Sequence, residues 1–138
     1  MINARRKGHG GEREVVKILK KYGIIASRNL EQTREGGHDL ITKGTVLEDY
    51  AIEIKTIGKW SNACRKKYWE QAVTQAKKVN KIPLLIWKIN YCLWFIEYEE
   101  NGELKIDYFE EWLEKTFKKM LLLSKKKTNR RIRQSKSV

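Results

Sequence analysis

Three charged residues, Asp39, Glu53 and Lys55, form the strongest chemical signal in the sequence. Glu53 and Lys55 lie two residues apart in a segment that alternates like a β-strand, so both point to one side of it, roughly 7 Å apart. A hairpin with the preceding strand would bring Asp39 beside them. Paired carboxylates suit Mg²⁺, which retains several waters and takes one or two protein carboxylates together with a substrate phosphate. The pattern indicates phosphodiester hydrolysis, in which Lys55 orients the nucleophile or offsets the charge that develops on phosphorus.

Glu12 is a third candidate carboxylate, identified by helical geometry. At about 100° per residue it falls at the edge of an apolar helical stripe, whereas Arg13 falls outside that stripe. A charged side chain on an inward face needs a partner, and a metal or a lysine at the sheet edge would serve. An equally good interpretation is a favourable anion in the first helical turn. The alternative to a catalytic role for Glu53 and Lys55 is an ordinary cross-strand or solvent-facing charge pair.

Helices and strands that position these residues are predicted along the whole chain. Apolar spacing predicts helices over 11–22 and 66–80 and a final helix with apolar residues from Phe109 to Met120. Gly44 and the pair Asn101-Gly102 predict hairpin loops. The predicted strands span 24–28, 38–42, 50–56, 84–87, 93–98 and 104–106. The sequence therefore predicts one α/β domain in which helices flank a central mixed β-sheet.

The charge distribution favours a polyanionic partner. The chain has 138 residues, with 30 Lys+Arg against 17 Asp+Glu and a formal charge of +13. Residues 97–117 are acidic, whereas residues 118–138 contain nine Lys+Arg and no Asp or Glu. We expect residues 124–138 to form a disordered basic arm that binds nucleic acid through counterion release. A solubilising tail is the alternative.

Composition also argues against several classes of protein. Cys64 and Cys92 form no CxxC pair, so neither a zinc site nor a disulfide framework is predicted. No stretch approaches the roughly 20 apolar residues of a membrane span, and residues 1–11 lack the apolar core of a signal peptide. We therefore expect a cytoplasmic protein without a membrane partner.

Further candidate contacts with nucleic acid surround the predicted second helix. Arg65, Lys66 and Lys67 precede two aromatic residues at its start, a combination suited to gripping a DNA backbone. Gln71 and Gln75 lie one turn apart and are possible accessory contacts to a phosphate or the nucleophilic water, although a polar helix edge is the more common explanation. His38 is a possible accessory because it adjoins Asp39, but two distant histidines make no zinc site.

The arrangement of Asp39 and Glu53-Ile54-Lys55 within these elements resembles the PD-(D/E)XK nuclease superfamily. Within it, the chain is most similar to the archaeal-type Holliday-junction resolvases over about residues 5–98. The matching segments are Arg5-Arg6-Lys7-Gly8, Gly11 to Val16, Arg28, Ile82-Pro83-Leu84-Leu85 and Trp94-Phe95-Ile96-Glu97. The resemblance implies a restriction-endonuclease-like core and a Mg²⁺-dependent endonuclease, with Mn²⁺ as a substitute. It also implies a homodimer that resolves four-way DNA junctions by paired symmetric nicks.

The resemblance assigns roles to individual residues. Glu12, Asp39, Glu53 and Lys55 match catalytic positions, and the three carboxylates among them are the expected metal ligands. Arg13 and Arg28 match basic positions that contact DNA. We also expect Arg5, Arg6 and Lys7 of the first matching segment to bind DNA.

Two features depart from the family pattern. The loop that ends in Gly36-Gly37-His38 is longer than expected, and residues 99–138 lie outside the resemblance. We therefore expect a nuclease core over 1–98, a hairpin and helix extension over 99–123 and the basic tail over 124–138. The alternative functions are a related nuclease that acts on duplex, flap or single-stranded DNA, and a non-catalytic nucleic-acid-binding module. The expected location is the cytoplasm, either with the nucleoid or in a virus-infected cell.

Overall fold

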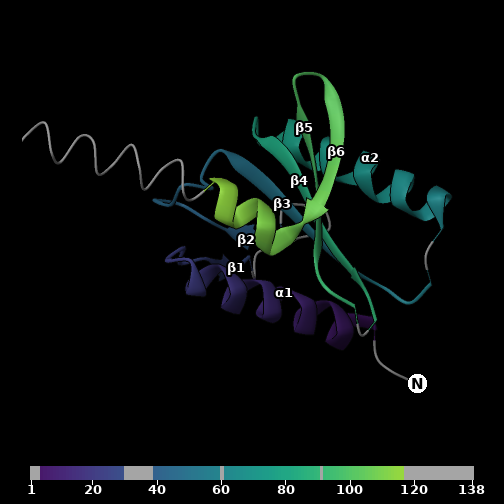
Figure 1. Cartoon of the computed structure of the whole chain (residues 1–138), viewed down its shortest axis with the longest axis horizontal. Coiled ribbons are helices and arrows are strands. Elements are labelled where there is room, and N and C mark those ends of the chain that lie inside the picture. Colours follow the sequence, from purple (N-terminus) through teal and green to yellow (C-terminus); the bar gives the residue numbers. More distant parts are fainter. Residues whose placement is uncertain (1–3, 30–38, 60, 91, 117–138) are drawn as a thin grey trace, which may run out of the picture.

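The structure is a computed structural model that describes residues 4–29, 39–59, 61–90 and 92–116, with side chains from residue 10 onward (Figure 1). Residues 109–116 are helical and follow the last strand directly. None of the helices in these ranges is long and apolar enough to span a membrane. The other elements are α1 (Ala4–Lys21), β1 (Ser27–Arg28), β2 (Leu40–Ile41), β3 (Tyr50–Ile57), α2 (Asn62–Lys78), β4 (Ile82–Ile89), β5 (Phe95–Glu100) and β6 (Glu103–Tyr108).

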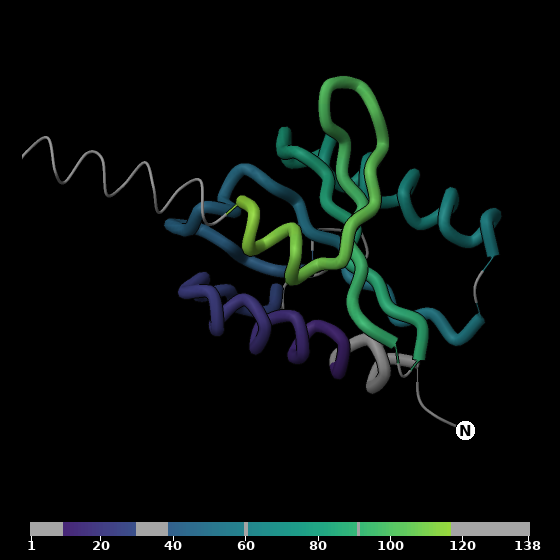
Figure 2. The backbone as a smooth tube through the Cα atoms, in the orientation of Figure 1, coloured from purple at the N-terminus to yellow at the C-terminus, as the bar shows by residue number. Residues whose placement is uncertain are grey.

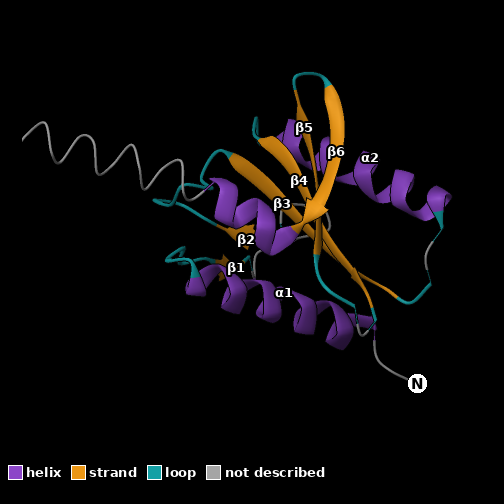
Figure 3. Ribbon diagram, viewed as in Figure 1, coloured by secondary structure: helices purple, strands orange, loops and turns teal. Residues whose placement is uncertain are grey.

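The main sheet has the strand order β3-β4-β5-β6 (Figure 3). The pair β3 and β4 is parallel, and α2 forms the crossover that a parallel pair requires. The pairs β4–β5 and β5–β6 are antiparallel. A separate antiparallel ribbon of β1 and β2 lies beside β3. The predicted mixed α/β architecture is therefore confirmed.

Helices cover both faces of the main sheet (Figures 1 and 2). On the face that packs against α1, here the α1 face, Ile52 and Ile54 join the larger core together with Phe109 of the C-terminal helix. On the opposite face, here the α2 face, Ile57 packs with residues of α2 and β4. Because side chains alternate along a strand, Glu53 and Lys55 lie on the α2 face.

Both long helices begin earlier than the sequence predicted. The helix α1 starts at Ala4 rather than residue 11 and includes three glycines. Gly11 packs directly on β3, since a Cβ atom there would lie 2.8 Å from Thr56 Oγ1. The helix α2 starts at Asn62 rather than residue 66, because the Ser61 side chain caps it by accepting a hydrogen bond from the Cys64 N–H at 3.1 Å.

The predicted hairpin around Gly44 is wrong in its pairing. Segment 38–42 contributes only the short strand β2, which pairs with β1, while β3 pairs with β4. The Thr42 hydroxyl donates to the Leu47 carbonyl at 2.8 Å, which stabilises the turn between β2 and β3. The second predicted hairpin is confirmed: Asn101 and Gly102 have φ angles of 53° and 80°, as its turn requires.

Candidate active site

The main chain of β3 holds the Asp39 carboxylate in place. Asp39 Oδ2 accepts a hydrogen bond from the Ile54 N–H at 2.6 Å, and the Asp39 N–H donates to the Ile52 carbonyl at 2.8 Å. The side chain is buried, with 8% of its residue surface exposed. These contacts take the place of a regular strand pair at the edge of β3. They bring Asp39 beside Glu53, as the sequence predicted. The predicted hairpin between segments 38–42 and 50–56, however, is absent.

Glu53 is buried among other carboxylates on the α2 face. Its pKa is raised to about 8, first by burial and second by the negative charge of Asp39. Lys55 acts in the opposite direction, and Glu12 adds a smaller increase. Glu53 therefore interacts electrostatically with each of the other three predicted catalytic residues. The positive charge of Lys55 is therefore not enough to offset burial and the two neighbouring negative charges, so the pKa of Glu53 stays raised.

Lys55 is held by α2. Its Nζ lies 5.2 Å from the centroid of the Tyr68 ring, within the range of a cation–π contact. This contact requires the Lys55 side chain to point toward α2, which confirms the face predicted by strand alternation. The lysine is half-buried beside Glu53 rather than extended into solvent.

Glu12 has an arginine as its partner. Arg28 Nε donates to Glu12 Oε2 at 2.9 Å, and the two side chains are 19% and 11% exposed. The sequence predicted a metal or a lysine as the partner of Glu12 and a DNA contact for Arg28. Among the described residues, no three Asp, Glu, His or Cys side chains are grouped closely enough to hold a metal ion. The carboxylates of Asp39 and Glu53 are therefore the candidate metal site. Direct metal ligation by Glu12 stays a prediction.

The remaining predicted residues are spread around this centre. Arg13, Lys66, Lys67 and Gln71 are exposed, and Gln75 is half-buried. Arg65 Nε donates to Glu97 Oε1 at 2.6 Å, so its guanidinium is tied to the protein. Arg5, Arg6 and Lys7 lie in α1, but their side chains lie outside the described structure, as do His38 and the tail 124–138. The predicted domain division stays a prediction.

Glu97 is a notable residue that the sequence reasoning did not assign. It lies on β5 and is fully buried. Burial raises its pKa, while the Arg65 charge and hydrogen bonds from Arg65 and Trp87 oppose the increase. Its position directly after the apolar run Leu93-Trp94-Phe95-Ile96 was the available signal, because a charged residue there needs a buried partner.

Comparison with known proteins gives a family match over nearly the whole chain. The model of the family described as "Phage putative PDDEXK endonuclease" matches residues 3–134. No curated protein matches the chain. A solved structure that is similar to this chain is that of Archaeoglobus fulgidus Hjc, a Holliday junction resolvase from an archaeal hyperthermophile. The identity is 21% over 75% of this chain and 85% of that chain, with a TM-score of 0.46.

Proposed function

The chain belongs to the phage PDDEXK endonuclease family, and from this membership we propose that it is a metal-dependent DNA endonuclease that resolves four-way junctions by paired symmetric nicks. The observation that carries the proposal is the placement of Asp39 and Glu53 together at the edge of β3, with Lys55 beside them. The family membership supports nuclease chemistry. Selectivity for the junction is the finer part of the proposal.

A divalent cation fits the two carboxylates. Both are buried, and their mutual repulsion helps to raise the pKa of Glu53, so a cation would relieve an unfavourable interaction. We assign Asp39 and Glu53 as ligands of Mg²⁺, for which Mn²⁺ would substitute, with Glu12 assisting directly or through water. When bound, the ion would supply Lewis-acid polarisation of the phosphodiester and activation of water.

Residues of the chain would provide the remaining chemistry. Lys55, held against Tyr68, orients the attacking water and offsets the charge that develops on phosphorus. Arg28 fixes the Glu12 carboxylate. The DNA backbone is gripped by basic side chains, which position it without reading its sequence. The proposed set comprises Arg5, Arg6, Lys7, Arg13, Arg28, Arg65, Lys66 and Lys67, with Gln71, Gln75 and His38 as accessory contacts and the tail as a further arm.

A junction with two-fold symmetry needs two nicks, which favours a homodimer with both sites directed at one DNA. The phage family supports action in the cytoplasm of a virus-infected cell, and association with the nucleoid is the alternative. Equilibrium sedimentation of the full chain tests the dimer. A monomer at the concentrations used for cleavage would remove this part of the proposal.

A nicking assay tests the function. The substrate is a synthetic four-way junction in Mg²⁺, compared with linear duplex, a flap and single strand of the same sequences. Asp39→Asn is the inactive variant, and Asp49→Asn is its matched control, because Asp49 is exposed and the charge change is identical. We expect paired symmetric nicks only in the junction, and we expect Asp39→Asn, but not Asp49→Asn, to abolish them. Cutting of the linear forms would support nuclease activity but contradict selectivity for the junction. No cutting of any substrate would favour a non-catalytic DNA-binding module.

A further inference from the structure

The strand β6 has an outer edge that pairs with nothing in the described part of the chain. It is the last strand of the main sheet, and its only partner there is β5 (Figure 3). The Phe109 N–H, one residue beyond β6, donates to the Trp94 carbonyl at 2.9 Å. Main-chain hydrogen bonds alternate along an antiparallel strand, so the odd-numbered residues of β6 bond to β5 and the even-numbered ones direct their N–H and C=O groups outward. The outward groups belong to Leu104, Ile106 and Tyr108.

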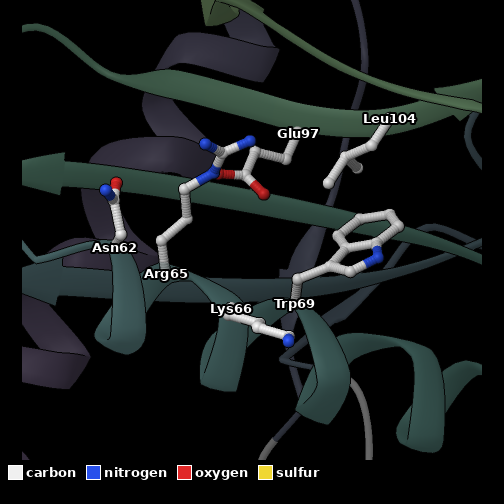
Figure 4. Close-up of a pocket in the computed structure, with 6 residues that line it drawn as sticks. All are labelled: Asn62, Arg65, Lys66, Trp69, Glu97 and Leu104. Carbon is white, nitrogen blue, oxygen red and sulfur yellow. The ribbon is translucent and has the colours of Figure 1, made fainter.

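The same three residues expose apolar side chains along this edge. Leu104, Ile106 and Tyr108 are 42%, 37% and 45% exposed. They lie on the α2 face, where the Tyr108 ring stacks on Phe95 with 5.0 Å between the centroids. On that face Leu104 also lines a small cavity together with Trp69 of α2 (Figure 4). Free main-chain groups beside an exposed apolar row are the features through which an edge strand adds a further strand.

The alternate residues of β6 are charged and limit which strand can pair with it. Glu103, Lys105 and Asp107 lie on the α1 face. The Tyr98 hydroxyl donates to Asp107 Oδ2 at 2.6 Å and orients that carboxylate. The Lys105 side chain is 43% exposed, with Nζ 3.8 Å from Glu100 Oε2. Like charges that face each other across two strands are destabilising, so a partner strand must present a negative charge to Lys105 and a positive charge to Asp107.

A second copy of β6 meets this requirement in one register. About a two-fold axis through Ile106, an antiparallel pair places Ile106 opposite itself and Leu104 opposite Tyr108, so the outward main-chain groups of both copies bond to each other. The same register places Lys105 of each copy opposite Asp107 of the other. A pair centred on residue 105 would place Lys105 opposite itself, and one centred on residue 107 would place Asp107 opposite itself. The charges therefore select the register centred on Ile106.

We propose that β6 pairs antiparallel with β6 of a second copy of this chain in this register, which joins two four-stranded sheets into one continuous sheet. The two-fold axis runs perpendicular to the sheet, so the Glu53 and Lys55 side chains of both copies lie on the same face. The inference rests on the proposed function and deepens it, because it names the surface that joins the two subunits. Two catalytic sites on one face of a continuous sheet suit two nicks in one DNA.

Complementary charge reversals test the interface by equilibrium sedimentation of the full chain. Lys105→Asp puts a carboxylate opposite Asp107, and Asp107→Lys puts an ammonium group opposite Lys105. Because each contact occurs twice in the dimer, we expect either variant alone to raise the dimer dissociation constant about tenfold. An equimolar mixture of the two variants should dimerise as tightly as wild type, since each copy then meets opposite charges, and this restoration establishes that both variants fold. Lys43→Asp is the matched control, because Lys43 is exposed and lies outside β6.

Cysteine cross-linking tests the register. In a Cys64→Ser, Cys92→Ser background, Ile106→Cys brings two thiols opposite each other, with roughly 5.5 Å between the Cα atoms, which is within the range of a disulfide. Leu104→Cys is the matched control, because residue 104 faces residue 108 of the other copy, and its two thiols would lie about 13 Å apart along the strands. We expect non-reducing electrophoresis to show a disulfide-linked dimer for Ile106→Cys alone. Equal cross-linking by both variants would overturn the proposed register.

The outcomes separate this interface from the proposed nuclease. A wild-type monomer, a dimer that survives both charge reversals, or a mixture that fails to dimerise would overturn the interface. Cleavage of the four-way junction in Mg²⁺ is measured separately, and Lys105 and Asp107 lie outside the catalytic residues. Paired nicking by a wild-type dimer that both reversals leave intact rejects the interface alone. The expected sedimentation results with no cutting of any DNA would reject the nuclease alone.

Discussion

Glu53 and Glu97 are buried glutamates in one row across the sheet, but their surroundings differ. Glu53 is 7% exposed, and its neighbours include two other carboxylates, so burial and repulsion raise its pKa to about 8 while Lys55 offsets only part of the effect. Glu97 is fully buried, but Arg65 donates to it directly. A buried acid that lacks sufficient counter-charge has the property expected of a cation site, whereas Glu97 has a direct arginine partner that opposes the effect of burial, although its pKa is still raised.

The largest expected effect comes from Asp39→Asn. We expect cleavage to fall about 1,000-fold, because the variant loses one of two metal ligands and with it several kcal/mol of transition-state stabilisation. The amide oxygen retains an acceptor for the Ile54 N–H, so the fold and the DNA affinity should persist. Single-turnover cleavage and a binding titration measure the two properties. Cleavage at the wild-type rate would show that the metal is held elsewhere.

Opposite changes in stability are expected when each glutamate is replaced by glutamine in metal-free protein. Glu97→Gln should lower the free energy of unfolding by about 2 kcal/mol, because it breaks a buried pair whose arginine is only partly exposed. Glu53→Gln should raise it by about 1 kcal/mol at pH 7, because it removes the cost of a buried acid in a repulsive site. Urea denaturation measures both. A loss for both variants would mean that Glu53 is already compensated within the chain.

The pH dependence of stability sharpens the same contrast. Glu53 has a folded-state pKa of about 8, above its model value of 4.5, so the unfolded chain releases this proton more readily. Its contribution to stability is fully present below pH 4.5 and is lost as the pH rises to about 8. Metal-free wild type should therefore lose stability relative to Glu53→Gln across this range, and Mg²⁺ should restore it. Parallel pH curves for the two proteins would contradict the assignment.

The sequence predicted the relative placement of Glu53 and Lys55 because strand alternation is a local property, and the contact of Lys55 with Tyr68 confirms the shared face. It could not predict how Asp39 is held, since the hydrogen bond to the Ile54 N–H forms only after two distant segments meet. Strand alternation also places Glu97 on a face without saying that the residue would be fully buried. Whether a strand residue is exposed depends on which helix packs over it.

The N-terminal helix shows the same limit and gives the smallest expected effect. Apolar spacing predicted a helix that starts at residue 11, but α1 starts at Ala4 and includes three glycines. Glycine disfavours a helix interior by about 1 kcal/mol relative to alanine, and tertiary packing overrides this preference. A Cβ atom at Gly11 would lie 2.8 Å from Thr56 Oγ1 and 3.3 Å from Trp94 Cη2, whereas one at Gly10 meets nothing within 4 Å. The helix therefore approaches β3 only because residue 11 has no side chain.

Alanine at the two positions should accordingly have opposite effects. We expect Gly10→Ala to raise the free energy of unfolding by about 0.5–1 kcal/mol through helix propensity alone. Gly11→Ala should lower it by about 1 kcal/mol, because overpacking outweighs the same gain. By moving α1 outward, Gly11→Ala should also separate Glu12 from Glu53 and reduce cleavage severalfold while Gly10→Ala does not. Equal cleavage by the two folded variants would show that the position of Glu12 relative to β3 does not limit the reaction, and the catalytic site would then reduce to Asp39, Glu53 and Lys55.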